Sequence, residues 1–217
     1  MSSILSFLSL GTSGIMPRIS ADARLWLVLL LLPSLPARSD LDAGRRSYEQ
    51  GNYATSLKEL TPLAEQGNSE AQVLIGQMYS RGQGVPLDFA KAIKWFKAAA
   101  ELGNSDGQLH LGLAYLKGVG VEKDVAQALK WLKLSANQGN VVAQLDLGLA
   151  FRNLSSIPHD YVEAWMWFEL AARQGDPLAP KQRDSLQRFM TRQQVEQARV
   201  RAAAWNPVIS SAHSAAR

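Results

Sequence analysis

The side chains that could perform catalysis or bind a metal are few and scattered in this sequence. Its three histidines, His110, His159 and His213, have no second potential ligand at the short spacings typical of metal sites. The chain has no cysteine, which excludes a thiol nucleophile and a disulfide framework. No Ser-x-x-Lys motif occurs, and Gly118-x-Gly120 lacks the Lys and Ser/Thr of a phosphate-binding loop. We therefore expect no catalytic residue, no cofactor and no metal site.

Paired carboxylates on facing helices are the remaining route to hydrolytic chemistry, because general acid–base catalysis often uses two carboxyl groups. Asp106 and Asp146 are the two acidic residues that could converge, although 40 positions separate them. Two solvated surface acids are the simpler interpretation of this pair.

These residues lie within a sequence that repeats every 36 residues. Glycine, glutamine, aspartate and tryptophan positions coincide at this shift: Gly76, Gly112 and Gly148; Gln72, Gln108 and Gln144; Asp88, Asp124 and Asp160; Trp95, Trp131 and Trp167. A fixed period of about 20–50 residues is typical of stacked repeat architectures. Similar successive units must therefore position any functional side chain.

Each unit is predicted to contain two helices, called helix A and helix B below. Asn104 can cap a helix A that runs to about residue 117, because its side chain can accept bonds from the free amides of the first turn. The glycines of segment 118–124 end this helix, and Asp124 caps a helix B that stops at Gly139. Gly112 lies inside helix A, where glycine costs about 1 kcal/mol relative to alanine, so we expect close packing of the neighbouring helix there. The tryptophans of helix B are interpreted as core residues.

The full pattern resembles the Sel-one-like repeat family, a relative of the tetratricopeptide repeats. It is carried by Ala71, Ile75-Gly76, Tyr79, Gly82-x-Gly84-Val85, Asp88, Ala92, Trp95, Ala99-Ala100 and Gly103, and it recurs in tandem over about residues 41–176. The resemblance implies an all-α fold, a right-handed α-solenoid of stacked helix-turn-helix repeats, that serves as a non-catalytic scaffold or adaptor for protein complexes. The alternative function, suggested by some exported members of the family, is a cell-wall or β-lactam-type hydrolase or modifying enzyme.

Seven segments are expected along the chain. They are a signal peptide at 1–39, an N-terminal capping repeat at 40–67, repeats at 68–103, 104–139 and 140–175, C-terminal capping helices at 176–205 and a disordered tail at 206–217. Asn153 to Ser156 replace the loop glycines of the last repeat, so this loop is expected to turn differently. The final helix A is expected to start after Asp176-Pro177, with Leu178, Gln182, Leu186 and Phe189 at helical spacing. Thr191 is expected to cap the last helix, whose apolar stripe is Val195, Ala198, Ala202 and Trp205.

The predicted signal peptide has a positive start, a short apolar core and small residues before a cleavage site. Arg24 precedes the apolar run Leu25–Leu32, and cleavage after Ser39 fits best. The run is shorter than the roughly 20 apolar residues of a membrane span. An uncleaved anchor remains an alternative, and a start at Met16 in place of Met1 would give a shorter leader.

The charge without the leader is close to neutral. Residues 40–217 carry 20 Lys and Arg against 18 Asp and Glu, a net charge of +2, which argues against nucleic acid as the main partner. We expect a periplasmic or secreted protein, without a stable membrane span, whose partner is a protein or peptide, with envelope components as candidates.

Positions that differ between repeats indicate where a partner binds. Residues that hold the fold should recur in each unit, whereas residues that contact a partner are free to change. The variable positions of helix A, called the helix A face below, are Glu70, Leu74, Gln77, Arg81, Asp106, His110, Leu113, Lys117, Val142, Asp146, Leu149 and Asn153. Their spacing of four, three and four forms one stripe per helix.

Stacking is expected to set these stripes side by side on the concave wall of the solenoid. With Leu113 and Leu149 exposed among charges, the surface would suit a protein or peptide segment. Helix B is expected to carry solvated charge on a convex side: Lys94, Lys97, Lys130, Lys133, Glu169 and Arg173. Tolerated variation of an inert surface is the alternative interpretation of the helix A differences.

Overall fold

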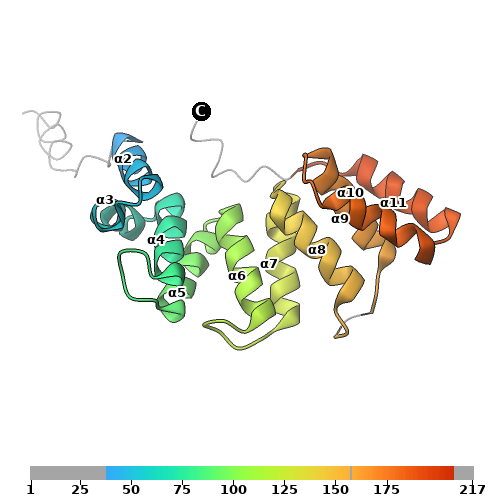
Figure 1. The fold of residues 1–217 in the computed structure, drawn as a ribbon, viewed down its shortest axis with the longest axis horizontal. Coiled ribbons are helices and arrows are strands. Elements are labelled where there is room, and N and C mark those ends of the chain that lie inside the picture. The colour runs from blue at the N-terminus through green and yellow to red at the C-terminus, as the bar shows by residue number, and fades with distance from the viewer. Residues whose placement is uncertain (1–37, 157, 208–217) are drawn as a thin grey trace, which may run out of the picture. The chain divides into compact units, whose positions relative to one another are not determined.

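The computed structural model describes residues 38–156 and 158–207, which form a series of helices that follow one another in chain order (Figure 1). The helices are α2 (Arg38–Glu49), α3 (Tyr53–Glu65), α4 (Ser69–Arg81), α5 (Phe89–Glu101), α6 (Ser105–Lys117), α7 (Val125–Asn137), α8 (Val141–Asn153), α9 (Tyr161–Arg173), α10 (Ala179–Leu186) and α11 (Arg192–Ala204), with a short 3-10 helix at Gln187–Phe189. The described residues contain no strand. None of these helices is long and apolar enough to cross a membrane.

Helices A and B of each repeat pack as a pair, and each helix B also packs against the helix A that follows. Helices A are α4, α6 and α8, and helices B are α5, α7 and α9. In addition, α4 contacts both α2 and α6, so helices A of consecutive units adjoin. This arrangement confirms the predicted all-α solenoid with a period of about 36 residues.

The predicted helix boundaries are present because side chains bind the free backbone groups at each end. Asn104 accepts bonds from Asp106 N and Gly107 N, and Asp124 accepts one from Gln127 N. Gly118 ends α6 in a left-handed conformation with φ of 70°. At the corresponding point α8 ends at Leu154, whose backbone is extended, so this loop does turn differently, although Ile157 lies outside the described residues.

A glycine in each helix A lies against a large side chain of helix B, as predicted for Gly112. A Cβ atom built on Gly76 would fall 2.6 Å from the Phe96 ring, and one on Gly112 would fall 2.8 Å from Leu132 Cγ. The residue that fills this contact follows the tryptophan and is not the tryptophan itself. The prediction that all the helix B tryptophans are core residues is therefore wrong in part, because Trp131 and Trp95 are only half-buried.

A buried glutamine ties each helix A to the preceding helix B. Side-chain Nε2 of Gln72, Gln108 and Gln144 donates to the carbonyl of Ala64, Ala100 and Ala136, at 2.9, 3.3 and 3.1 Å. Carbonyls in the last turn of a helix lack the usual intrahelical partner. Each of these three carbonyls also accepts the backbone N–H of the glycine three residues later, so the glutamine supplies a second hydrogen bond. The recurrence of glutamine in the sequence is thus a structural requirement.

The C-terminal helices differ from the sequence prediction. Helix α10 begins at Ala179 and not directly after Asp176, because Pro180 has no N–H with which to bond the Asp176 carbonyl. Leu178 and Phe189, which stand at helical spacing with Leu186, are each 56% exposed. Thr191 caps α11 in a capping box with Gln194, as predicted.

The predicted leader and tail fall largely outside the described residues, which begin at 38 and end at 207. Cleavage of the leader after Ser39 and the choice between Met1 and Met16 as the start residue remain predictions.

Candidate functional site

The structure brings the twelve residues of the helix A face together on α4, α6 and α8. None of them is buried: Arg81, Asp106, Lys117, Val142 and Asn153 are exposed, and the other seven are half-buried. Hydrogen bonds between neighbouring helices A are made by long side chains and by the residues that cap the helices. Asn140 Nδ2, for example, donates to Asp106 Oδ1 across the boundary between repeats at 2.8 Å.

Leu113 and Leu149 are not exposed as predicted. Leu113 is half-buried against the apolar cluster that contains Leu109 and Leu147, and Leu149 packs in the same way against the cluster around Trp165. The reason is that the apolar clusters extend across neighbouring helices, so an apolar side chain at their edge is partly covered. These two leucines contribute more to stacking than to a free surface.

A polar network crosses three helices on this face. Tyr48 Oη of α2 lies 3.3 Å from Gln77 Oε1 and 3.1 Å from Gln83 Oε1, two acceptors that share its one hydroxyl proton. Gln77 Nε2 lies 3.0 Å from His110 Nε2. Because the Gln77 amide presents its NH₂ group to His110, the imidazole Nε2 accepts and the neutral ring carries its proton on Nδ1. Arg81 Nη1 donates to Tyr48 Oη at 2.9 Å.

The surroundings of His110 favour its neutral form. Its ring stacks on Phe96 with 4.5 Å between ring centroids. Burial lowers the pKa of His110, the nearby Asp106 carboxylate opposes this shift, and the Arg81 charge adds to it. The hydrogen bond from Gln77 and the lowered pKa therefore both favour the neutral imidazole of His110.

Asp146 is a half-buried acid of the face. Burial raises the pKa of its carboxyl group, and the charge of Lys117 opposes that shift only in part. Asp106, in contrast, is exposed and bonded to Asn140. Within residues 38–156 and 158–207 no hydrogen bond joins the two acids.

The remaining candidate ligands are also dispersed. The described residues contain no group of three or more His, Asp or Glu side chains that could hold a metal ion. His159 is exposed in the loop before α9 and stacks on Tyr161, and His213 lies outside the described residues. The predicted helix B charges are exposed except for Glu169, which is half-buried between Arg173 and Arg183.

Sequence reasoning missed two parts of this face. Tyr48 and Arg45 extend it into the first unit, where Arg45 pairs with Glu70. A fourth row lies beyond α8, where the exposed Leu178 and Phe189 stand one period after Val142 and Asn153. One further shift of 36 residues would have identified this row from the sequence.

Comparison with known proteins agrees with the repeat pattern. The Sel1 repeat profile matches residues 69–104, 105–140 and 141–176. No curated protein sequence is significantly similar to this chain.

Two solved structures share the fold. One is a Sel1 repeat protein from Oxalobacter formigenes, 32% identical with a TM-score of 0.63, and the match covers 67% of this chain and 60% of that one. Another is a protective antigen present in uropathogenic Escherichia coli strains, described as having an SLR fold, 30% identical with a TM-score of 0.65. That match covers 85% of this chain and 44% of the antigen. The chain belongs to the Sel1 repeat family.

Proposed function

We propose that this protein is a non-catalytic interaction scaffold of the cell envelope that binds a protein or peptide segment along the helix A face. The observation that carries the proposal is that the recurring and the variable residues of helix A lie in different environments. Residues that recur between repeats, such as Gln108 and Gly112, are buried in contacts with helix B. The residues that vary are exposed or half-buried and adjoin from one repeat to the next.

The character of this face changes along the chain. Its exposed side chains are charged on α4 and α6, at Arg81, Asp106 and Lys117, and become uncharged or apolar at Val142 and Leu178. A partner segment with a charged part followed by an apolar part matches that order. Sel1 repeat proteins generally act as protein-interaction scaffolds, which supports the same function.

Charge reversal on the face tests this proposal. The variant Arg81→Glu, Asp106→Lys, Lys117→Glu reverses three exposed charges near helix ends. It also removes the bonds of Arg81 and Asp106 to neighbouring units, so its helicity is first compared with that of the parent by circular dichroism. A matched control, Lys58→Glu with Lys94→Glu, changes exposed lysines of α3 and α5. In a pull-down from envelope extract the control should recover the partners of the parent, and the face variant should lose them. Equal recovery by both variants would remove the face as the binding site.

The envelope location is part of the proposal and rests on the sequence. The arginine, the apolar run and the small residues up to Ser39 are typical of an exported chain. Sequencing the N-terminus of the protein recovered from cells should give Asp40 as the first residue. A protein that begins at Met1 or Met16 would contradict removal of the leader.

A further inference from the structure

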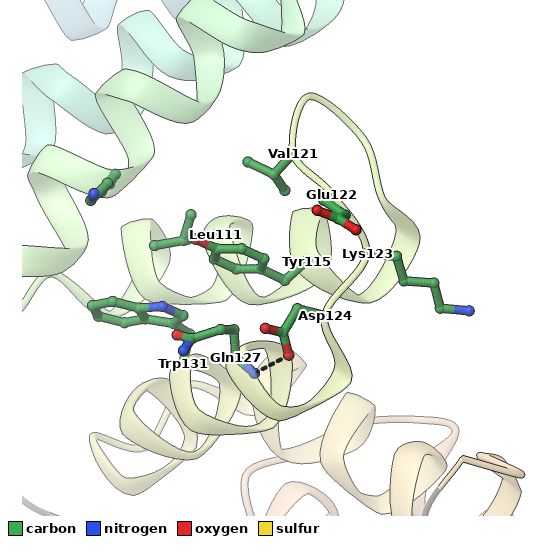
Figure 2. A pocket seen from close by; sticks show the side chains of 9 residues that line it. Leu111, Tyr115, Val121, Glu122, Lys123, Asp124, Gln127 and Trp131 are labelled. Atoms are coloured by element: carbon green, nitrogen blue, oxygen red, sulfur yellow. Dashed lines mark hydrogen bonds between the residues drawn. The ribbon is translucent and has the colours of Figure 1, made fainter.

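A pocket of about 710 Å³ lies between α5 and the repeat formed by α6 and α7 (Figure 2). The Tyr115 ring of α6 and the Trp131 ring of α7 line it, and Glu122, Lys123 and Asp124 come from the loop that borders it. Lys97 of α5 also lines the pocket. None of the residues that line this pocket belongs to the helix A face. Its chemistry can be compared with that of the same place in the repeats before and after.

In the preceding repeat this place holds a lysine side chain. Tyr79 stands where Tyr115 stands, and Lys91 Nζ lies 5.4 Å from the centroid of its ring. The same ammonium group lies 3.4 Å from Asp88, which corresponds to Asp124. Lys91 corresponds to Gln127 by the shift of 36 residues. An aromatic ring and a carboxylate thus bind a cation from within the chain.

In the following repeat a different lysine reaches the same place. Phe151 stands where Tyr115 stands, and Lys133 Nζ lies 5.1 Å from its ring centroid. The Lys133 ammonium group is also 3.8 Å from Glu163. Two positions of the repeat can therefore supply the cation, and each flanking repeat uses one of them.

The middle repeat uses neither position. Gln127 is neutral, and Lys97, which corresponds to Lys133, is paired with Glu101 of its own helix at 3.9 Å. Among the side chains of the described residues, no Lys or Arg lies over the Tyr115 ring. Lys130 lies over Trp131 but is not among the residues that line the pocket.

We propose that this pocket binds the cationic side chain of a lysine or arginine from a partner polypeptide. The Tyr115 ring offers its face to the cation, and Asp124 and Glu122 supply the opposite charge. Trp131, whose ring already has Lys130 over it, forms a wall of the pocket. The partner's side chain would occupy the place that Lys91 and Lys133 occupy in the flanking repeats. This site is separate from the helix A face and does not depend on the function proposed for that face.

The binding can be measured on the purified protein by following the indole N–H signal of Trp131 in a ¹H–¹⁵N spectrum, assigned by its loss in Trp131→Phe. The probe is Nα-acetyl-lysine methylamide. The matched probes are the norleucine derivative, which lacks the charge, and the glutamate derivative, which reverses it. We expect saturable shifts with the lysine probe alone. Saturable shifts with the glutamate probe, or none with the lysine probe, would overturn the proposal.

Two variants connect the signal to this mechanism. Gln127→Lys restores the lysine of the preceding repeat, so its own side chain should fill the pocket and the probe should no longer shift Trp131. Asp124→Asn keeps the helix cap but removes one charge, and should weaken binding about two- to fivefold. Lys97→Ala removes a positive charge that lines the pocket and should strengthen binding of the lysine probe. Unchanged affinity in both Gln127→Lys and Asp124→Asn, with helicity retained, would overturn the proposal.

Discussion

Gln138 donates its side-chain amide to Oε1 of the buried Gln108 at 2.7 Å, and Gln174 makes the same bond to Gln144 at 2.8 Å. The residue that follows helix B thus completes the bonding of the buried glutamine in helix A of the same repeat. In the repeat at 68–103 this residue is Leu102, and Oε1 of Gln72 is buried without a hydrogen-bond partner among the described residues.

Leu102→Gln should therefore stabilise the protein. The new amide can donate to Gln72 Oε1, and a side chain that is 48% exposed becomes polar. We expect the free energy of unfolding to rise by about 0.5–1.5 kcal/mol, measured by urea denaturation. The reverse change, Gln138→Leu, should lower it by about 1–3 kcal/mol because Gln108 loses its donor. A loss of stability in Leu102→Gln would contradict this account of the glutamine bonds.

Gly148→Ala should destabilise the protein by about 1–3 kcal/mol through overpacking. A Cβ atom at this position would fall 2.5 Å from Phe168 Cδ1, and Phe168 is fully buried. Combining the change with Phe168→Leu should cost less than the sum of the two single changes, because the smaller side chain makes room. Thermal unfolding followed by circular dichroism measures all three variants. Strict additivity would show that the two residues are not in contact.

Trp167→Ala should cost more stability than Trp131→Ala. Trp167 is 3% exposed and its Nε1 donates to Glu163 at 3.1 Å, so its removal leaves a cavity worth about 3–5 kcal/mol. Trp131 is half-buried and borders an open pocket, which lowers the cost of removing it. Equal losses in chemical denaturation would mean that the two positions are equally buried in solution.

His110 should make stability depend on pH. Because burial lowers its pKa from the usual 6.5, the unfolded chain binds a proton more readily than the folded protein. The stability contributed by neutral His110 is therefore present above the usual value and is lost as the pH falls below it. Between about pH 7.5 and about pH 5 the free energy of unfolding should fall more steeply in the parent than in His110→Gln. The control His159→Gln, in an exposed loop, should show the same dependence of the free energy of unfolding on pH as the parent. The same dependence in His110→Gln would refute the prediction.

Much of the fold could be predicted from the sequence because its signals are local. Asn104, Asp124 and Gly118 act on the backbone next to them, so their effect does not depend on distant residues. The partner of Gly112 could not be predicted in the same way. Trp131 and Leu132 are neighbours in helix B, and which of them meets the glycine depends on how the helix is rotated about its axis.

The candidate site was less predictable because its exposure depends on contacts between repeats. Spacing places Leu113 on the helix A face, but packing against a cluster that includes Leu132 of α7 and Leu147 of α8 decides that it is half-buried. The network of Tyr48, Gln77 and His110 joins three units and exists only once they are stacked. At the C-terminus, apolar spacing alone could not distinguish the buried Leu186 from the exposed Phe189.

The most direct test of the helix A face is a photo-crosslinking amino acid placed at single exposed positions of the protein in cells. Val142 and Lys117 represent the face, and Lys58 and Lys94 represent the exposed lysines of α3 and α5. We expect the same partner to be crosslinked from positions 117 and 142, with little or none from positions 58 and 94. Crosslinking of the partner from 58 and 94, with none from 117 and 142, would contradict the assignment of this face as the binding surface.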